Sequence, residues 1–362
     1  MTSMKLSGGV LYALGAAALF GLSTPLSKLL LGQLSPLLLA GLLYFGSGIG
    51  LSLLRAVRSR DKREAAIPRS QWPWLAGAVL FGGALGPVLL LFGLRATSAA
   101  SASLLLNLEG VFTALLAWFV FKENFDRRIA LGMLAIVAGG VLLSWQGEGG
   151  LAIAPGALLV AGACLCWGID NNLTQKVSSS DPFQIAAIKG LVAGTVNLTL
   201  AFALGATLPA LPVLGGALVV GFFGYGLSLA LFVLALRHLG TARTGAYFSL
   251  APFVGAAAAL LVLREPIGPL FLGAAALMGV GVWLHLTEKH EHMHTHEYME
   301  HTHMHVHDEH HQHKHVPGID LHEPHSHSHV HEPLTHSHPH FPDIHHRHGH
   351  SHTPSGEIVE SS

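Results

Sequence analysis

The sequence predicts an all-α integral membrane protein with ten transmembrane helices, arranged as two inverted five-helix repeats. Three observations predict this fold. Hydrophobic residues make up 51% of the chain and charged residues only 11%, whereas about 25% of the residues in a soluble domain are charged. Long apolar stretches recur between residues 8 and 287. The same short motifs also occur twice along the chain, which indicates an internal duplication.

A membrane-spanning helix needs roughly 20 mainly apolar residues. We expect such helices at 8–31, 35–54, 72–94, 98–121, 128–146, 153–176, 183–206, 211–236, 242–263 and 267–287. These stretches are too long and continuous for barrel strands, which alternate with period two. The first stretch is expected to be an uncleaved helix and not a signal peptide, because its apolar run continues past Leu30 and carries Pro25 and Lys28.

The distribution of Lys and Arg predicts the orientation of these helices. The linker 55–69 holds 6 cations, and the linkers near 122–128 and 237–243 are also basic. The linkers at 146–150 and 205–212 contain no cation. We therefore expect a multi-pass protein of the cell membrane with both termini in the cytoplasm.

The internal duplication is visible at a constant offset of 142 residues. Identical residues meet at this offset in the pairs Leu94/Leu236, Arg95/Arg237, Ala100/Ala242, Leu108/Leu250, Ala114/Ala256, Ala117/Ala259 and Glu123/Glu265. Each unit holds five crossings, so the second copy should have the opposite orientation, as in many secondary transporters. The predicted organisation is a first repeat at 1–146, a second repeat at 150–287 and a tail at 288–362.

These repeated motifs carry a family resemblance. Leu94 to Ala99, then Leu108-Glu109, then Phe121-Lys122-Glu123 resemble the EamA repeat of the drug/metabolite transporter superfamily. Residues 236–266 resemble it again, whereas the tail lies outside the resemblance. The resemblance implies a ten-helix carrier of small metabolites, often an exporter. In one departure, Gly110 stands where the family pattern usually has a proline.

Ionisable groups inside a bilayer are costly, which makes each of them a functional candidate. Glu109 lies near the middle of the fourth stretch. Burial favours the neutral form of a carboxyl group, so Glu109 is a candidate for proton exchange and coupling. The alternative is that Glu109 hydrogen-bonds a neighbouring helix and only stabilises packing.

The most polar intramembrane stretch surrounds Asp170 in the sixth segment. We expect Asp170 to line a central cavity with Glu109, unless the helix ends earlier and leaves Asp170 at the interface. Other expected substrate-binding residues are Trp167, Asn171, Ser23, Thr24 and Tyr247. Lys28 and Lys189 are expected to extend toward the lipid headgroups, and His238 to lie in a solvated linker.

The tail at 288–362 differs in composition from the rest of the chain. It holds 25 of the 27 histidines and has a formal charge of −9, while residues 1–287 have +8. Neutral histidine is a common metal ligand and suits Zn, Ni, Co and Cu. The expected metal ligands are His290, His292, His294, His296, His301, His303, His305, His307, His325, His327, His329 and His331. Few apolar residues are available for a core, so we expect disorder without metal.

Several function classes lack support in the sequence. No phosphate-cradling Gly-Lys-Ser/Thr loop and no Gly-x-Ser-x-Gly elbow occurs, which argues against an enzyme or an ATP-driven pump and for transport without a cofactor. The short basic linker 55–69 is better explained as a signal for membrane topology, or as a contact with anionic lipid, than as a nucleic-acid-binding site. Three hypotheses stay open: a metabolite carrier in the lipid bilayer with a metal-binding tail, a transition-metal carrier fed by that tail, and a membrane-anchored metal sensor or store.

Overall fold

The computed structural model describes residues 8–57, 67–121, 127–145, 154–177, 180–287, 291–295, 299–305, 325–331 and 335–339. Up to residue 287, the regular structure in the described residues is helical. Its helices are α1 (Gly8–Leu30), α2 (Pro36–Val57), the 3₁₀ helix η2 (Arg69–Gln71), α3 (Trp72–Ala78), the π-helix η3 (Val79–Leu85), α4 (Gly86–Ala96), α5 (Ala99–Leu105), α6 (Leu108–Phe121), α7 (Arg127–Ser144), α8 (Pro155–Gln175), α9 (Pro182–Ala203), α10 (Leu211–Gly221), the π-helix η4 (Phe222–Leu227), α11 (Ser228–Phe248), α12 (Ala251–Val262) and α13 (Pro269–Leu286).

The expected segments coincide with one helix or with a run of consecutive helices, except the eighth and ninth, which share α11. In the described part of the chain, 8 helical spans are long and apolar enough to cross a membrane, and the apolar helices Ala251–Val262 and Pro269–His285 are shorter. Their apolar composition is what a bilayer requires, because a helix satisfies its own backbone hydrogen bonds. The protein is therefore a multi-pass membrane protein.

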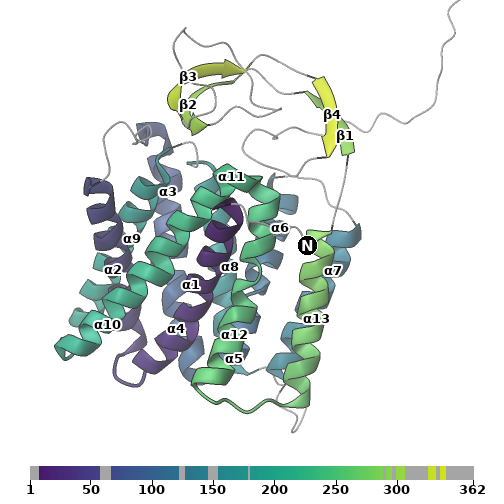
Figure 1. Cartoon of the computed structure of the whole chain (residues 1–362). Helices are drawn as coiled ribbons and strands as arrows, with labels where there is room; N and C mark the ends of the chain where they lie inside the picture. Colours follow the sequence, from purple (N-terminus) through teal and green to yellow (C-terminus); the bar gives the residue numbers. More distant parts are fainter. Residues whose placement is uncertain are drawn as a thin grey trace, which may run out of the picture.

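The helices form one bundle, drawn in Figure 1. The helix pairs α2 with α9, α7 with α13, and α1 with α11 pack closely. α13 ends at the side of the bundle beyond which the strands lie (Figure 1), and we call this side the tail end. The opposite side, where α5 and α13 begin, is called the far end.

One expected linker is absent from the structure. We predicted a break between the eighth and ninth segments, around Arg237 and His238, but α11 continues as a helix through both positions to Phe248. Leu, Ala and Arg are good helix formers, and one glycine costs only about 1 kcal/mol. The break comes later, before Pro252 near the start of α12, because proline has no N–H to continue the hydrogen-bond ladder.

The structure describes only short segments of the tail. Four short strands are described there: β1 (Glu291–Thr295), β2 (Met299–His305), β3 (His325–His331) and β4 (Thr335–Pro339). β1 pairs with β4 and β2 with β3, both antiparallel. Alternation with period two suits a strand, because every second residue lies on the same face. The expectation of disorder for residues 288–362 stays a prediction, and His290, His296 and His307 lie outside the described residues.

Glycines set the distance between α2 and α9. A Cβ atom added at Gly190 would lie 2.6 Å from the backbone nitrogen of Gly48, and one added at Gly194 would lie 2.7 Å from Cα of Phe45. Real Cβ atoms essentially never approach other atoms this closely. The two helices can therefore pack backbone to backbone, as small residues allow in membranes.

This contact predicts the effect of Gly190→Ala. The added methyl group should push α2 from α9 and lower the free energy of unfolding by about 1–3 kcal/mol, the usual cost of overpacking. The matched control is Gly279→Ala, where nothing lies within 4 Å of the added Cβ. Unfolding of both variants in detergent micelles measures the difference, and equal stability would contradict this role of Gly190.

Candidate functional site

The fourth and ninth segments are both interrupted near their middle. α5 ends at Leu105 and α6 begins at Leu108, while α11 ends at Phe248 and α12 begins at Ala251. The offset of 142 relates the two breaks and places Gly110 opposite Pro252. The break in the first half therefore forms without the proline that the family pattern usually has. Glu109 lies in the first turn of α6, where a helix N-terminus favours negative charge.

Side chains satisfy the carbonyl groups that this first break frees. The Asn107 amide donates a hydrogen bond to the Leu104 carbonyl at 2.8 Å. The thiol of Cys164, on α8, lies 3.6 Å from the Leu105 carbonyl. Such partners are needed because hydrocarbon offers no water to bond the exposed backbone. Cys164 is buried, so its thiol contacts this carbonyl inside the protein.

Glu109 is bonded to α8 across the seam between the two helices. Nδ2 of Asn171 donates to Oε1 of Glu109 at 2.9 Å and to the hydroxyl of Thr113 at 3.2 Å. Asn171 lies in the last turns of α8 and is exposed, whereas Glu109 lies near the middle of its segment and is partly exposed. In the described part of the chain no cation lies within ion-pair distance of the Glu109 carboxylate. This cluster therefore holds a carboxylate that an amide stabilises but does not neutralise.

Asp170 belongs to a different contact. Its carboxylate pairs with the ammonium group of Lys189 on α9, at 2.6 Å and 2.7 Å from Nζ to the two oxygens. The Thr174 hydroxyl donates to the same carboxylate at 2.9 Å, and both charged side chains are largely buried. Gly82 faces Asp170 so closely that any side chain at position 82 would overlap the carboxyl group.

The partner of Asp170 corrects the expectation for Lys189. We expected the Lys189 ammonium group to extend toward the headgroups, but it lies against a carboxylate inside the bundle. The reason is energetic, since a buried charge needs a partner. One signal was available in the sequence, because an acid and a base in consecutive membrane segments are expected to pair.

The π-helix η3 offers a second polar contact. The carbonyl of Gly82 accepts hydrogen bonds from the Tyr44 hydroxyl at 2.7 Å and from Nε1 of Trp167 at 3.0 Å. π-helical turns are frequent at functional sites. The second π-helix, η4, lies at the position in the second half that the offset of 142 predicts. Tyr44 was not anticipated, because nothing in the sequence marks η3 as irregular.

An aromatic cluster connects α1, α8, η4 and α11. The ring of Phe20 lies 6.5 Å from that of Trp167, 6.0 Å from that of Tyr225 and 5.6 Å from that of Phe248. Tyr44 lies 5.4 Å from Tyr225. The cluster therefore gathers aromatic rings from both halves of the chain around Phe20, and Trp167 is its member that was predicted for the site.

The other predicted residues lie near this cluster. Ser23 and Thr24 are buried in α1, and the Ser23 hydroxyl donates to the Phe20 carbonyl at 2.6 Å. Tyr247 lies in the last turn of α11 and is partly buried. The expectation paired Glu109 with Asp170, whereas the structure brings Glu109 into direct contact with Asn171 and turns Asp170 toward α9.

Two charged residues close the far end of the bundle. Lys28 donates to the carbonyls of Leu94 and Thr97, at 2.5 Å and 2.7 Å, after the last turn of α4. The Glu265 carboxylate accepts from the amides of Ala99 and Ala100, at 2.7 Å and 2.8 Å, at the start of α5. The expectation that Lys28 extends to the headgroups is therefore wrong, because it caps a helix C-terminus. We call Lys28 and Glu265 the far-end latch.

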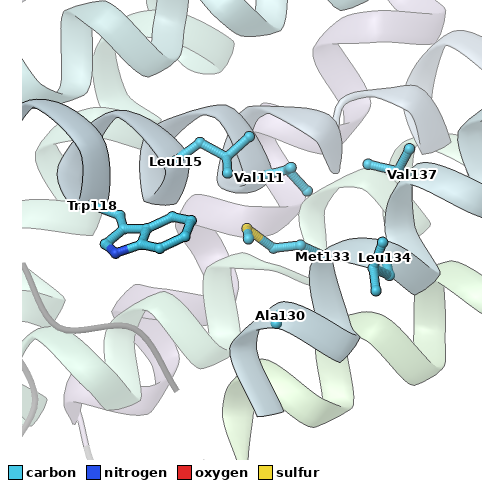
Figure 2. Close-up of a pocket in the computed structure, with 7 residues that line it drawn as sticks. All are labelled: Val111, Leu115, Trp118, Ala130, Met133, Leu134 and Val137. Atoms are coloured by element: carbon cyan, nitrogen blue, oxygen red, sulfur yellow. The ribbon is translucent and has the colours of Figure 1, made fainter. Parts of the chain in front are cut away.

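An apolar groove of about 300 Å³ lies between α6 and α7. Figure 2 shows the residues that line it: Val111, Leu115, Trp118, Ala130, Met133, Leu134 and Val137. Val111 and Leu115 lie on the side of α6 opposite to Glu109, given 3.6 residues per turn. The groove therefore does not extend the polar cluster.

Metal ligands do not gather in the membrane part. Among the residues whose side chains the structure describes, no group of three or more His, Cys, Asp or Glu could hold a metal ion. The predicted ligands at 292, 294, 301, 303, 305, 325, 327, 329 and 331 lie in the four strands. For these the structure gives the backbone register alone.

Comparison with known proteins gives one family. The model of the EamA-like transporter family matches residues 7–145 and again residues 154–287. An uncharacterized transporter of Methanothermobacter thermautotrophicus is 31% identical over 298 residues, which cover 78% of this chain and 87% of that protein. The uncharacterized transporter YvbV of Bacillus subtilis is 23% identical over 275 residues, covering 75% of this chain and 88% of YvbV.

A shorter relative and a solved structure were also found. The probable 4-amino-4-deoxy-L-arabinose-phosphoundecaprenol flippase subunit ArnE of Pseudomonas paraeruginosa is 45% identical over 82 residues, or 23% of this chain and 69% of ArnE. A protein crystal structure aligns with a TM-score of 0.56 at 18% identity, covering 77% of this chain and 96% of that one. At this identity the alignment shows a shared fold alone.

The buried pair predicts the effect of removing either charge. Asp170→Asn or Lys189→Met should each lower the free energy of unfolding by about 3–5 kcal/mol, because each leaves the other charge buried without its partner. The double variant should lose much less than the sum of the two. Unfolding in micelles measures this cycle, and additive losses would contradict the pairing.

Proposed function

The chain belongs to the EamA-like transporter family, and from this we propose that it is a secondary transporter of small metabolites across the cell membrane, working as a permease or exporter. The relatives named above are transporters or a flippase subunit, which agrees with a role that is not enzymatic. The ArnE match names a lipid-linked sugar, but it covers only 23% of this chain. It therefore does not define the substrate.

The observation that carries the proposal is the pair of interrupted segments. Broken helices at corresponding positions of two halves are the best pointer to a transporter site, because half-helix ends provide polar groups at the midplane. Glu109 begins one of these half-helices and bonds Asn171. We assign substrate contact and coupling to Glu109 and Asn171, with Trp167, Ser23, Thr24 and Tyr247 around them and Asp170 behind them.

Several relations support two inverted repeats at 1–146 and 150–287. The π-helix η3 packs against α8 and α9, and η4 packs against α1 and α2. Gly82 faces Asp170, and Gly224 faces Ser23. An offset of 142 residues relates Gly82 to Gly224, and an offset of 147 residues relates Ser23 to Asp170. Such symmetry lets one fold exchange two states. Together with the uneven distribution of Lys and Arg among the linkers, this symmetry favours termini in the cytoplasm.

The far-end latch fits one state of such an exchange. Lys28 and Glu265 tie α1 and the linker between α12 and α13 to the turn between α4 and α5. Arg264, next to Glu265, has a positive φ of 52°, a conformation that costs a non-glycine residue free energy and persists only where its surroundings hold it. In the proposed cycle this end is closed and opens when the latch breaks.

The tail adds a second element to the proposal. We assign divalent-metal binding to its histidines, as a buffer or regulator beside a metabolite carrier. The alternative is a carrier of Zn, Ni or Co ions fed by the tail, which the concentration of 25 histidines in residues 288–362 favours. Transport assays with and without these ions distinguish the two.

The proposal predicts the behaviour of Glu109→Gln. Purified protein in liposomes should move a substrate from a radiolabelled panel of amino acids, amines and sugars without nucleotide, driven by an imposed proton gradient. Hydrogen bonds to charged groups contribute about 1.5–3 kcal/mol, so loss of the carboxylate should reduce gradient-driven transport by about tenfold or more. Glu64→Gln, a carboxylate in the linker 55–69, is the control. Undiminished gradient-driven transport by Glu109→Gln would show that Glu109 does not couple transport to the proton gradient.

The latch predicts the behaviour of Glu265→Gln. Loss of a helix cap costs about 0.5–2 kcal/mol, so the far end should open more often. A membrane-impermeant thiol reagent should label Ser103→Cys, a buried position in α5, about fivefold faster in this background. Arg95→Gln, an exposed charge at the same end, is the control. Identical labelling rates in both backgrounds would show that Glu265 does not hold this end closed.

A further inference from the structure

The groove between α6 and α7 is open on the outer side of the bundle. One stripe of apolar side chains on each helix lines it: Val111, Leu115 and Trp118 on α6, and Ala130, Met133, Leu134 and Val137 on α7. Positions three, four and seven residues apart lie on one face of a helix. Leu134 is 64% exposed and Val137 is 41% exposed, whereas Val111 and Met133 are buried. The floor of the groove therefore lies inside the protein, and its rim faces the membrane.

The packing of α7 leaves this groove open. α7 packs mainly against α13 and only sparsely against α6, and a volume of about 300 Å³ remains between α6 and α7. Ala130 has the smallest side chain of the lining and leaves space near the Trp118 ring (Figure 2). An unfilled apolar groove loses dispersion contacts, and water needs polar partners that this lining does not offer. An apolar occupant is therefore favoured.

The shape of the groove indicates which apolar group can fill it. From Val111 to Trp118 the groove follows α6 for about 10 Å along the helix axis. It therefore runs in the direction in which the helices cross the bilayer, which is also the direction of the lipid acyl chains. An α-helix with its side chains is about 10–12 Å across, too wide to enter a groove of about 300 Å³. A helix of a second copy could only cover the rim.

A basic side chain stands at one end of the groove. Arg128, in the first turn of α7, donates to a carbonyl after the end of α13, so α7 begins at the tail end. Arg127 is exposed and precedes Ala130 by three residues, which places both on one face of α7. A guanidinium group has five N–H donors, enough to bond a phosphate in addition to a group of the protein. Arginine and phosphate frequently form two parallel hydrogen bonds.

We propose that this groove binds one anionic phospholipid, with an acyl chain between α6 and α7 and the phosphate group at Arg127. Trp118 lies at the tail end of the groove, and tryptophan is enriched at the level of the headgroups. The tail end is also the proposed cytoplasmic side, where anionic lipids give the membrane a negative surface potential. The bound chain would join α7 to α6, two helices that touch each other only sparsely. The inference concerns the outer surface and is independent of the transport proposal.

The test uses the fluorescence of Trp118 in the full-length protein in detergent micelles. The protein is titrated with phosphatidylglycerol whose acyl chains carry bromine, a contact quencher of tryptophan, and separately with the equivalent brominated phosphatidylcholine. The chain has 6 tryptophans, so each protein is measured with and without Trp118→Phe, and the difference gives the signal of Trp118. We expect saturable quenching, at about fivefold lower concentration for the anionic lipid because of the one arginine.

Two pairs of variants test the two parts of the site. Arg127→Gln should abolish the difference between the two lipids, and the control Arg69→Gln, an exposed arginine at the start of η2, should keep it. Ala130→Phe should fill the groove and remove saturable quenching by both lipids. Its control is Ala138→Phe, an exposed alanine of α7 outside the lining. Arg127 is exposed, so its variant tests the site without disturbing the packing of the helices.

Three results would overturn the lipid site. The first is quenching that does not saturate, or that is equal for the two lipids, since it would come from ordinary contact with surrounding lipid. The second is the same loss of quenching in Ala130→Phe and Ala138→Phe. The third is efficient disulfide cross-linking between two copies that carry Leu134→Cys in the native membrane, which would assign the rim to a second copy of this chain.

Discussion

The arrangement of this protein depends on one constraint: inside a bilayer every backbone polar group must find its partner within the protein. Unbroken helices meet it by themselves, but the π-helices and the broken fourth and ninth segments do not. The Gly82 carbonyl is satisfied by Tyr44 and Trp167, and the Leu104 and Leu105 carbonyls by Asn107 and Cys164. Polar and aromatic side chains from distant segments therefore converge where helices are irregular. The candidate site lies among them because the irregular backbone already requires them there.

Asp170 and Asn171 are neighbours on α8, but the charged residue and the amide residue have different roles. Asp170 is paired with Lys189 and packed against Gly82, so it holds α8, α9 and η3 together. Asn171, one residue on and about 100° around the helix, turns to α6 and bonds Glu109. In the described residues that carboxylate has an amide partner and no cation. A charge left without a counter-ion in a medium of low dielectric must be neutralised by a proton or a ligand. The seam between α6 and α8, and not the contact of α8 with α9, is therefore where binding can change the energy of the protein.

Composition and periodicity were enough to place most of the segments. They also marked Glu109 and Asn171 as candidates, since a bilayer penalises each polar group, and their role in transport stays a prediction. They did not give the direction in which Asp170 faces, because two residues adjacent in sequence can face different helices. They also placed a linker near His238 where α11 continues, since charged residues mark a membrane boundary more reliably than a helix end. The latch could not be predicted for a similar reason. Lys28 binds backbone carbonyls and Glu265 binds backbone amides of another segment. The sequence does not show which backbone groups are available for such bonds.

The junction between bundle and tail limits how the two can influence each other. Nη1 of Arg128 donates to the Thr287 carbonyl at 3.0 Å, and Nε2 of His285 lies 3.1 Å from the Ile129 carbonyl. The end of α13 is thus fixed to the start of α7, and these two helices pack mainly against each other. One contact leads from α13 toward the site, because Nδ2 of Asn107, in the break before Glu109, lies 3.9 Å from Sδ of Met278 on α13. A shift of α13 along α7 would therefore act on this break, and through it on the first turn of α6 that carries Glu109.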